Sequence, residues 1–191
     1  MLDVSRSDLT AGVAGSGTMG AGIAIVAARA GFNTIVYDTK AEALDRARSQ
    51  SEGFFRKSVE RGKLKTEELP AILANWTPTT RIDEFGACDI VIEAISERMD
   101  WKSDLYKKVA PHLGENTIFA SNTSGLSINT LAQAFPENLR HRFCGVHFFN
   151  PPRYMHLVEL IACKETEAPI LDQLEKFLVS TLGKEIGRAH V

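Results

Sequence analysis

Apolar residues along this chain occur either in short unbroken runs or in longer stretches where they recur every three to four positions. Unbroken runs at 89–95 and 117–122 indicate strands covered on both faces of a sheet. The stretches at 41–63 and 168–184 have the spacing of helices with one apolar side. Because strands and helices alternate, the pattern predicts a doubly wound α/β fold, with a mainly parallel sheet and helices on both faces.

The same pattern predicts where each element lies. We expect strands at 9–14, 33–38, 89–95, 117–122, 142–149, 156–162 and 185–191. We expect helices at 21–31, 41–63, 65–76, 99–113, 127–135 and 168–184, the third of them interrupted by Pro70. A chain of 191 residues with 44% hydrophobic content suits one domain, residues 1–191.

Charge and cysteine content restrict the class of protein. The 22 basic and 24 acidic residues are mixed along the chain and give a net charge of −2, which argues against a nucleic-acid partner or a membrane surface. We find neither a signal-peptide pattern nor a membrane-spanning run. Three cysteines without metal-ligand spacing indicate buried reduced thiols and no metal site. A cytoplasmic location is expected.

The stretch Gly15–Gly20 reads G-x-G-x-x-G between a predicted strand and a predicted helix. In such a turn the first glycine permits the tight bend, the second admits a pyrophosphate, and the third lets helix and strand pack closely. The N–H groups around Thr18 and Met19, at the helix N-terminus, would then face the phosphates. The alternative is a plain strand-to-helix turn, but the position favours a Rossmann dinucleotide site at Gly15, Gly17 and Gly20.

Asp38 ends the next predicted strand and completes this pattern. A carboxylate there can accept hydrogen bonds from the adenosine ribose and would repel a 2′-phosphate, which favours NAD over NADP. Lys40 nearby weighs in the opposite direction.

Two ionisable residues, His147 and Glu159, lie in the mostly apolar stretch 145–160. Burying such groups is costly unless they are paired or used. One interpretation is a general base whose second ring nitrogen is held by a carboxylate. The other is a structural histidine and a surface carboxylate at a strand edge.

Four stretches together carry a resemblance to a known family: 15–24 (GSGTMGAGIA), 91–102 (VIEAISERMDWK), 121–128 (SNTSGLSI) and 145–160 (GVHFFNPPRYMHLVEL). They closely resemble the N-terminal NAD-binding domain of the 3-hydroxyacyl-CoA dehydrogenases of fatty-acid β-oxidation. The resemblance implies oxidation of L-3-hydroxyacyl-CoA to 3-ketoacyl-CoA, with NAD as cofactor and acyl-CoA as substrate.

The resemblance also implies roles for single residues. His147 corresponds to the catalytic base, Glu159 to the carboxylate that orients it, and Ser124 to a residue that contacts the substrate oxygen. Cofactor contacts are implied at Met19, Asp38, Glu97, Lys102, Ser124 and Asn150.

The sequence departs from that family in two respects. The family has a further helical domain that forms most of a homodimer interface, and this chain ends at Val191 before any such domain. The resemblance therefore implies the cofactor-binding part of an enzyme that is dimeric as a whole. Phe54 and Arg61 stand where the family has a CoA-contacting serine and a lysine. A dehydrogenase of a non-CoA hydroxy acid or alcohol, and a catalytically silent NAD-binding module, are the alternatives.

Overall fold

The computed structural model describes residue 6 and residues 8–190 of the chain. Residues 1–5, 7 and 191 lie outside this description, and with them most of the N-terminal segment inspected for a signal peptide and the last residue of the final expected strand. The described part forms one eight-stranded sheet in the order β3-β2-β1-β4-β5-β6-β7-β8. Its strands are β1 Thr10–Ala14, β2 Asn33–Tyr37, β3 Trp76–Thr79, β4 Ile90–Glu93, β5 Ile118–Ser121, β6 Phe143–Phe148, β7 Leu157–Ala162 and β8 Glu185–His190.

The sheet is parallel except where β6 meets β7, which run antiparallel. From β1 the chain builds outward through β2 and β3, and then returns to place β4 on the other side of β1. The strand order therefore reverses between β1 and β4, and ligands of open α/β sheets bind beside such a reversal. The prediction of a mainly parallel, Rossmann-like sheet is confirmed.

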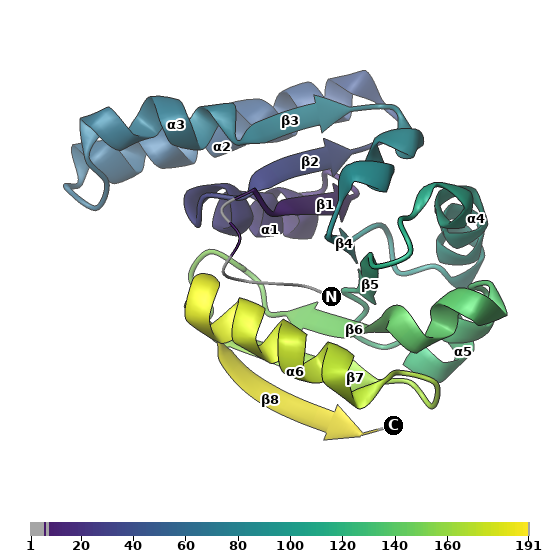
Figure 1. Cartoon of the computed structure of the whole chain (residues 1–191). Helices are drawn as coiled ribbons and strands as arrows, with labels where there is room; N and C mark the ends of the chain where they lie inside the picture. The colour runs from purple at the N-terminus through teal and green to yellow at the C-terminus, as the bar shows by residue number, and fades with distance from the viewer. Residues whose placement is uncertain (1–5, 7, 191) are drawn as a thin grey trace.

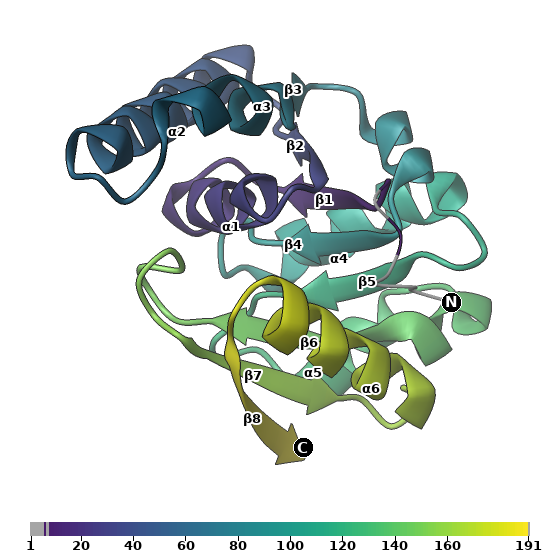
Figure 2. The same cartoon turned by 60° about the vertical axis from the view of Figure 1, so that its left-hand side comes forward.

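Helices cover both faces of the sheet (Figures 1 and 2). One face carries α1 Thr18–Arg29, α2 Ala41–Glu60, α3 Leu69–Ala74 and α6 Ala168–Lys176. The other carries the 3₁₀ segment η2 Ile82–Ala87, α4 Met99–Val109 and α5 Ile128–Gln133. Shorter turns lie at η1 Thr66–Glu68, η3 Ala110–His112, η4 Glu137–Arg142 and the π-helical η5 Phe177–Thr181.

Two hydrophobic layers hold these faces to the sheet. Under α1 and α6 the layer is mainly aliphatic and alanine-rich, so that the backbones approach closely. Under α4 and α5 it is centred on four aromatic rings with centroids 4.8 to 6.1 Å apart, from Tyr106, Phe119, Phe135 and Phe143. Such packing fixes the ends of β4, β5 and β6, where polar side chains gather.

The predicted helix 65–76 is wrong at its C-terminal end. α3 ends at Ala74, and Trp76 begins strand β3, which pairs in parallel with β2 and which the pattern did not predict. Pro78 sits in this strand, a residue typical of the outermost position in a sheet, where its missing N–H costs least. Pro70 stands in the first turn of α3, after η1, a position that suits proline.

Smaller differences concern the later segments. The expected strand 156–162 begins one residue later, at Leu157, so His156 lies in the preceding turn and not in the strand. The expected helix 168–184 is α6 followed by η5, and it closes at Gly183, whose φ of +64° suits glycine.

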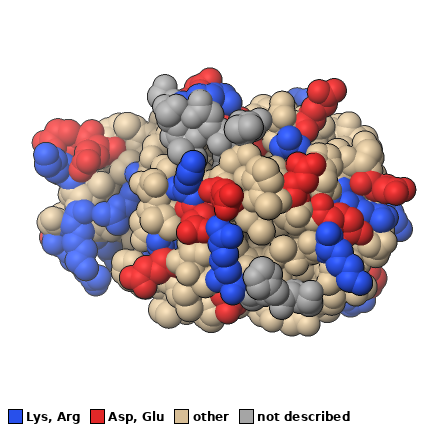
Figure 3. Space-filling model, turned by 60° about the horizontal axis from the view of Figure 1, so that its bottom comes forward, with Lys and Arg blue, Asp and Glu red and all other residues tan. Residues whose placement is uncertain are grey.

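Charged side chains are distributed over the surface, and the three cysteines are in the interior. On the face shown in Figure 3, basic and acidic side chains are interspersed. Within residues 8–190 we find no helix long and apolar enough to cross a membrane, and no cluster of three metal-ligating side chains. Cys88, Cys144 and Cys163 are buried free thiols, and burial raises the pKa of Cys144.

Candidate active site

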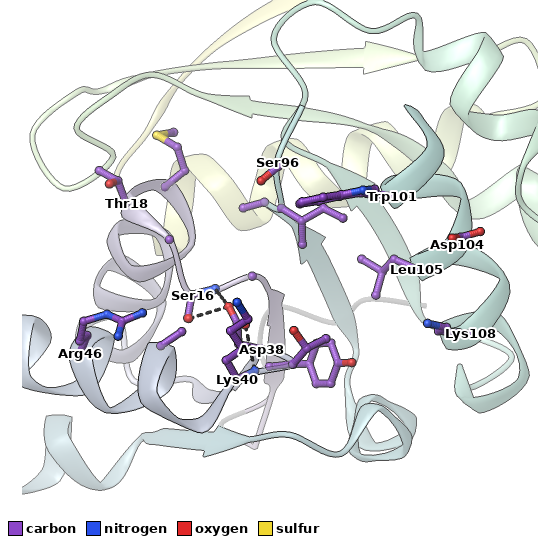
Figure 4. Close-up of a pocket in the computed structure, with 18 of the residues that line it drawn as sticks. Ser16, Thr18, Asp38, Lys40, Arg46, Ser96, Trp101, Asp104, Leu105 and Lys108 are labelled. Atoms are coloured by element: carbon purple, nitrogen blue, oxygen red, sulfur yellow. Dashed lines mark hydrogen bonds between the residues drawn. The ribbon is translucent and has the colours of Figure 1, made fainter. Parts of the chain in front are cut away.

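A cavity of about 870 Å³ opens where the strand order reverses. The glycine turn after β1 forms one wall, Asp38 after β2 lies at its floor, and α4 forms the opposite wall through Trp101 (Figure 4). Its edge reaches Ser96, so the residues around His147 lie beyond the cavity itself. Trp101, Arg46 and Lys108 line this space and were not anticipated from the sequence.

The glycine turn has the geometry of a phosphate cradle. Gly15 adopts φ +101°, and its N–H donates to the carbonyl of Tyr37 at 2.8 Å. A Cβ on Gly20 would lie 1.8 Å from the carbonyl oxygen of Gly15, so only glycine permits this packing of α1 against the turn. A Cβ on Gly17 would meet no described atom within 4 Å, and no described side chain caps α1 there. The N–H groups of the first turn are therefore available to an anion.

The Asp38 carboxylate is held rigidly beside this turn. Its Oδ2 accepts hydrogen bonds from the Ser16 N–H at 3.0 Å and from the Ser16 hydroxyl at 2.7 Å, and Oδ1 accepts from the Lys40 N–H at 3.2 Å (Figure 4). The predicted residues Gly15, Gly17, Thr18, Met19 and Asp38 all line the cavity.

His147 and Glu159 are opposite each other across the antiparallel pair β6–β7. His147 Nδ1 lies 2.9 Å from Glu159 Oε2, and Nε2 lies 3.0 Å from the hydroxyl oxygen of Ser124. A carboxylate can only accept, so Nδ1 carries the proton in the neutral ring and Nε2 presents its lone pair. The structure brings together the three residues that the resemblance singled out for catalysis.

These residues are more open than the apolar stretch suggested. The side chains of His147 and Glu159 are 15% and 36% exposed, and Ser124 is exposed. Asn150 is exposed in the turn after β6. A small molecule therefore has access to Nε2 and to the serine hydroxyl.

Ser121 and Asn122 connect the Ser124 loop to two neighbouring strands. The Ser121 hydroxyl donates to the buried carboxylate of Glu93 at 2.7 Å, and Asn122 Oδ1 accepts from the Phe148 N–H at 2.8 Å. The loop that carries Ser124 is thus tied both to β4 and to β6.

Glu97 and Lys102 belong to the same network. Glu97 Oε1 accepts hydrogen bonds from the Thr123 hydroxyl and from the N–H groups of Ser124 and Gly125, at 2.8 and 2.9 Å for the two amides. Lys102 is only 1% exposed and lies between Glu93 and Glu97, so in this conformation it offers almost no surface to a cofactor. Partial burial acts to raise the pKa of Glu97, but the hydrogen bonds and the Lys102 charge outweigh it and lower the pKa to about 2.

Glu93 was missed from the sequence, although a carboxylate at the end of the apolar run 89–95 was a signal. It is fully buried and accepts from Lys102 Nζ at 2.6 Å, the Tyr106 hydroxyl at 2.8 Å and the Ile95 N–H at 2.8 Å.

A doubly wound sheet, a glycine cradle at its reversal point and a carboxylate after β2 together define a Rossmann dinucleotide-binding domain. Comparison with known proteins identifies the family within this class. The family model described as "3-hydroxyacyl-CoA dehydrogenase, NAD binding domain" matches residues 10–188, and the chain belongs to this family. NAD is accordingly its cofactor, and the family is one of oxidoreductases.

Individual proteins of similar sequence or structure have related descriptions. The chain is 41% identical to the 3-hydroxyadipyl-CoA dehydrogenase of Escherichia coli K12, over 95% of this chain and 38% of that protein. It is 38% identical to a fatty acid oxidation complex subunit alpha of Idiomarina loihiensis, over 92% of this chain and 24% of that protein. The crystal structure of a 3-hydroxybutyryl-CoA dehydrogenase from E. coli K12 superimposes with a TM-score of 0.91 at 39% identity, over 96% of this chain and 38% of that one. The chain thus spans well under half the length of these relatives.

Proposed function

We propose that this chain is the NAD-binding part of an enzyme that oxidises L-3-hydroxyacyl-CoA to 3-ketoacyl-CoA in fatty-acid β-oxidation. The observation that carries the proposal is the continuous hydrogen-bonded series Ser124–His147–Glu159, within a domain that belongs to this family. In it His147 is the general base, Glu159 orients it, and Ser124 contacts the substrate oxygen. The whole enzyme is a homodimer in this proposal.

The cofactor would be held by the cradle and by Asp38. The N–H groups of Gly17, Thr18 and Met19 face the space in front of α1, and the rigid Asp38 carboxylate accepts from ribose hydroxyls. Asn150 and Glu97 Oε2, which lies 3.5 Å from the Lys102 ammonium, complete the proposed contacts. When bound, NAD⁺ accepts the hydride that the carbinol carbon loses as it becomes a carbonyl.

His147 takes the proton in this scheme. Its Nε2 lone pair points to the Ser124 hydroxyl at 3.0 Å, so a substrate hydroxyl that approaches both atoms from the open side can donate to Nε2 and accept from the serine. As the imidazole gains the proton, Glu159 at Nδ1 faces a positive ring, and this favours the transfer. In the reverse direction Ser124 polarises the ketone.

A second cavity, of about 330 Å³, supports a CoA ester as the substrate. Arg29, Arg153 and His156 line it together with the rings of Phe54 and Tyr154, so it suits a ligand with phosphates and an aromatic base. Arg153 lies over both rings, 5.4 and 4.9 Å from their centroids. Phe54 in place of the family's serine instead favours the second candidate, a dehydrogenase of a smaller hydroxy acid or alcohol without CoA.

The test compares wild type with His147→Gln in NADH oxidation with acetoacetyl-CoA, with NADH binding titrated in parallel. We expect the variant to lose about 10²- to 10⁴-fold in turnover, the contribution of a general base, while it binds NADH like wild type. His112→Gln, an exposed histidine outside the site, is the matched control and should leave both unchanged.

Other outcomes separate the alternatives. Turnover with a free 3-keto acid but not with acetoacetyl-CoA would favour the non-CoA dehydrogenase. NADH binding without turnover by wild type would mean that this chain supplies only the cofactor-binding part, and His147→Gln would then be compared with wild type in the full-length parent protein. A folded wild type that does not bind NADH would contradict the proposal at its first step.

A further inference from the structure

The loop that carries Ser124 depends on a carboxylate from another element. Residues 122–127 leave β5 without regular structure, and Ser124 itself is exposed. Three consecutive donors of this loop, the Thr123 hydroxyl and the N–H groups of Ser124 and Gly125, converge on Glu97 Oε1. One oxygen atom thereby fixes the backbone on either side of the Ser124 side chain. Hydrogen bonds to a charged acceptor are stronger than neutral ones, which suits this use.

Glu97 is in turn held from the interior. It stands in the short segment between β4 and α4, and its side chain is 42% exposed, so little packing restrains it. Its second oxygen lies 3.5 Å from the Lys102 ammonium. That ammonium is 1% exposed and lies 2.6 Å from Glu93, which is fully buried and accepts three further hydrogen bonds.

A continuous series of charges therefore runs from the core to the candidate active site. It passes from Glu93 through Lys102 to Glu97, and from there to the loop whose serine contacts His147. The alternating signs attract at each step, and burial of the inner pair screens it little from its partner.

We propose that Glu97 and Lys102 are positioning residues for Ser124, with Lys102 transmitting the rigidity of the buried Glu93 cluster to the Ser124 loop. Glu97 acts on Ser124 through the loop, with Oε1 accepting from the loop donors and Oε2 facing Lys102. This assignment refines the proposed function, but its first readouts do not depend on turnover.

The test is amide hydrogen exchange by NMR on the full chain, in wild type, Glu97→Gln and Glu97→Ala. In Glu97→Ala we expect the Ser124 and Gly125 amides to exchange at least about tenfold faster, which corresponds to about 1.4 kcal/mol. Glu97→Gln keeps an acceptor without the charge and should fall between. The His147 Nε2 resonance should shift in step with these amides, because the Ser124 hydroxyl is no longer held beside it.

Asp100→Asn is the matched control, since this exposed carboxylate lies three residues away in the first turn of α4 and forms its ion pair with Arg98. It should leave the loop amides and the His147 resonance unchanged. The amide exchange is recorded without NADH, so a lost cofactor contact at Glu97 cannot account for the result. Unchanged loop amides in Glu97→Ala would overturn the proposal, whatever the change in NADH affinity.

Lys102 is tested in the double variant Glu93→Gln/Lys102→Met, because Lys102→Met alone would leave a buried unpaired carboxylate and could unfold the chain. The near-ultraviolet circular dichroism of the double variant serves to show that it is folded. We expect faster exchange at Ser124 and Gly125, by a smaller factor than in Glu97→Ala. A folded double variant with wild-type loop amides would remove Lys102 from the series and overturn that part of the proposal.

Discussion

Two carboxylates at the ends of strands serve the site in the same way. The Asp38 carboxylate accepts hydrogen bonds from the N–H groups of Ser16 and Lys40. The Glu97 carboxylate accepts hydrogen bonds from the N–H groups of Ser124 and Gly125. In both cases a fixed negative charge organises backbone that would otherwise have no partner in a strand or helix. The charge thus shapes the site even where its side chain touches no ligand.

The low pKa of Glu97 means that the contribution of its charge to stability can be measured as a function of pH. The folded pKa of about 2 lies below the ordinary value of 4.5, so between these values the unfolded chain binds more protons. The stabilisation is therefore complete above pH 4.5 and is lost as pH falls toward 2. We expect the melting temperature of wild type to exceed that of Glu97→Gln by a constant margin above pH 4.5, and this margin to shrink below it. A margin independent of pH in thermal melts would contradict a charge-based role for Glu97.

For single residues, the sequence predicted which residues belong to the site better than it predicted which side chains they contact. Ser124, His147 and Glu159 were predicted together, and the structure places them in direct contact. Lys102, which the resemblance gives as a cofactor contact, is buried with its ammonium next to Glu93 and Glu97, and its contact with NAD stays a prediction. A motif gives the position of a residue along the chain, whereas the direction of a long side chain depends on which charges lie near it in space. The Glu93 carboxylate, nine residues before Lys102, decides that direction.

The elements around the site differ in how readily their sequence reveals them. β1, β4 and β5 are central, covered on both faces and apolar except for one polar residue at an end of each, so their pattern is plain. β3 has the sequence WTPT, with two exposed residues and a proline, and its strand conformation depends on pairing with β2. Because that pairing joins distant parts of the chain, local periodicity could not predict it.

The turn between β6 and β7 is an element held from two sides. Lys184 Nζ donates to the carbonyls of Pro152 and Met155 at 2.6 and 2.8 Å, while α1 packs close at Gly22, where a Cβ would lie 2.9 Å from Pro152. Burial lowers the pKa of Lys184. Asn150 is therefore carried by a turn that both the helix and the start of β8 restrain.

The strand–turn–helix unit at the cradle leads to a prediction about two glycines. Gly20→Ala would force its new methyl against the Gly15 carbonyl and push α1 away from the turn, so we expect a loss of about 1 to 3 kcal/mol in the free energy of unfolding and weaker NADH binding. Gly53→Ala is the control: it lies within α2 with no described atom near the new methyl, and should stabilise by up to about 1 kcal/mol. Urea unfolding and NADH titration of both variants measure this. Equal effects of the two substitutions would contradict the close approach at Gly20.

For the molecule as a whole, the central strands are covered by a hydrophobic layer on each face. We therefore expect the local stability of the strands to decrease from the centre of the sheet to its edges. The amides of β4 and β5 lie between α-helical layers on both faces, whereas β3 and β8 are the outermost strands of the described sheet. We expect β4 and β5 to exchange only through global unfolding, and β3 and β8 to exchange through smaller openings. Hydrogen exchange of the intact chain tests this order, and equal protection of β3 and β5 would contradict it.

The pairing of β6 with β7 has a consequence for how long His147 and Glu159 remain opposite each other. His147 and Glu159 meet because their strands are in register, with backbone ladders on both sides, and not because a loop folds over them. A slip of one residue between β6 and β7 would turn every buried side chain of β7 outward. The register that places the two residues opposite each other therefore lasts as long as the folded sheet, independently of the Ser124 loop.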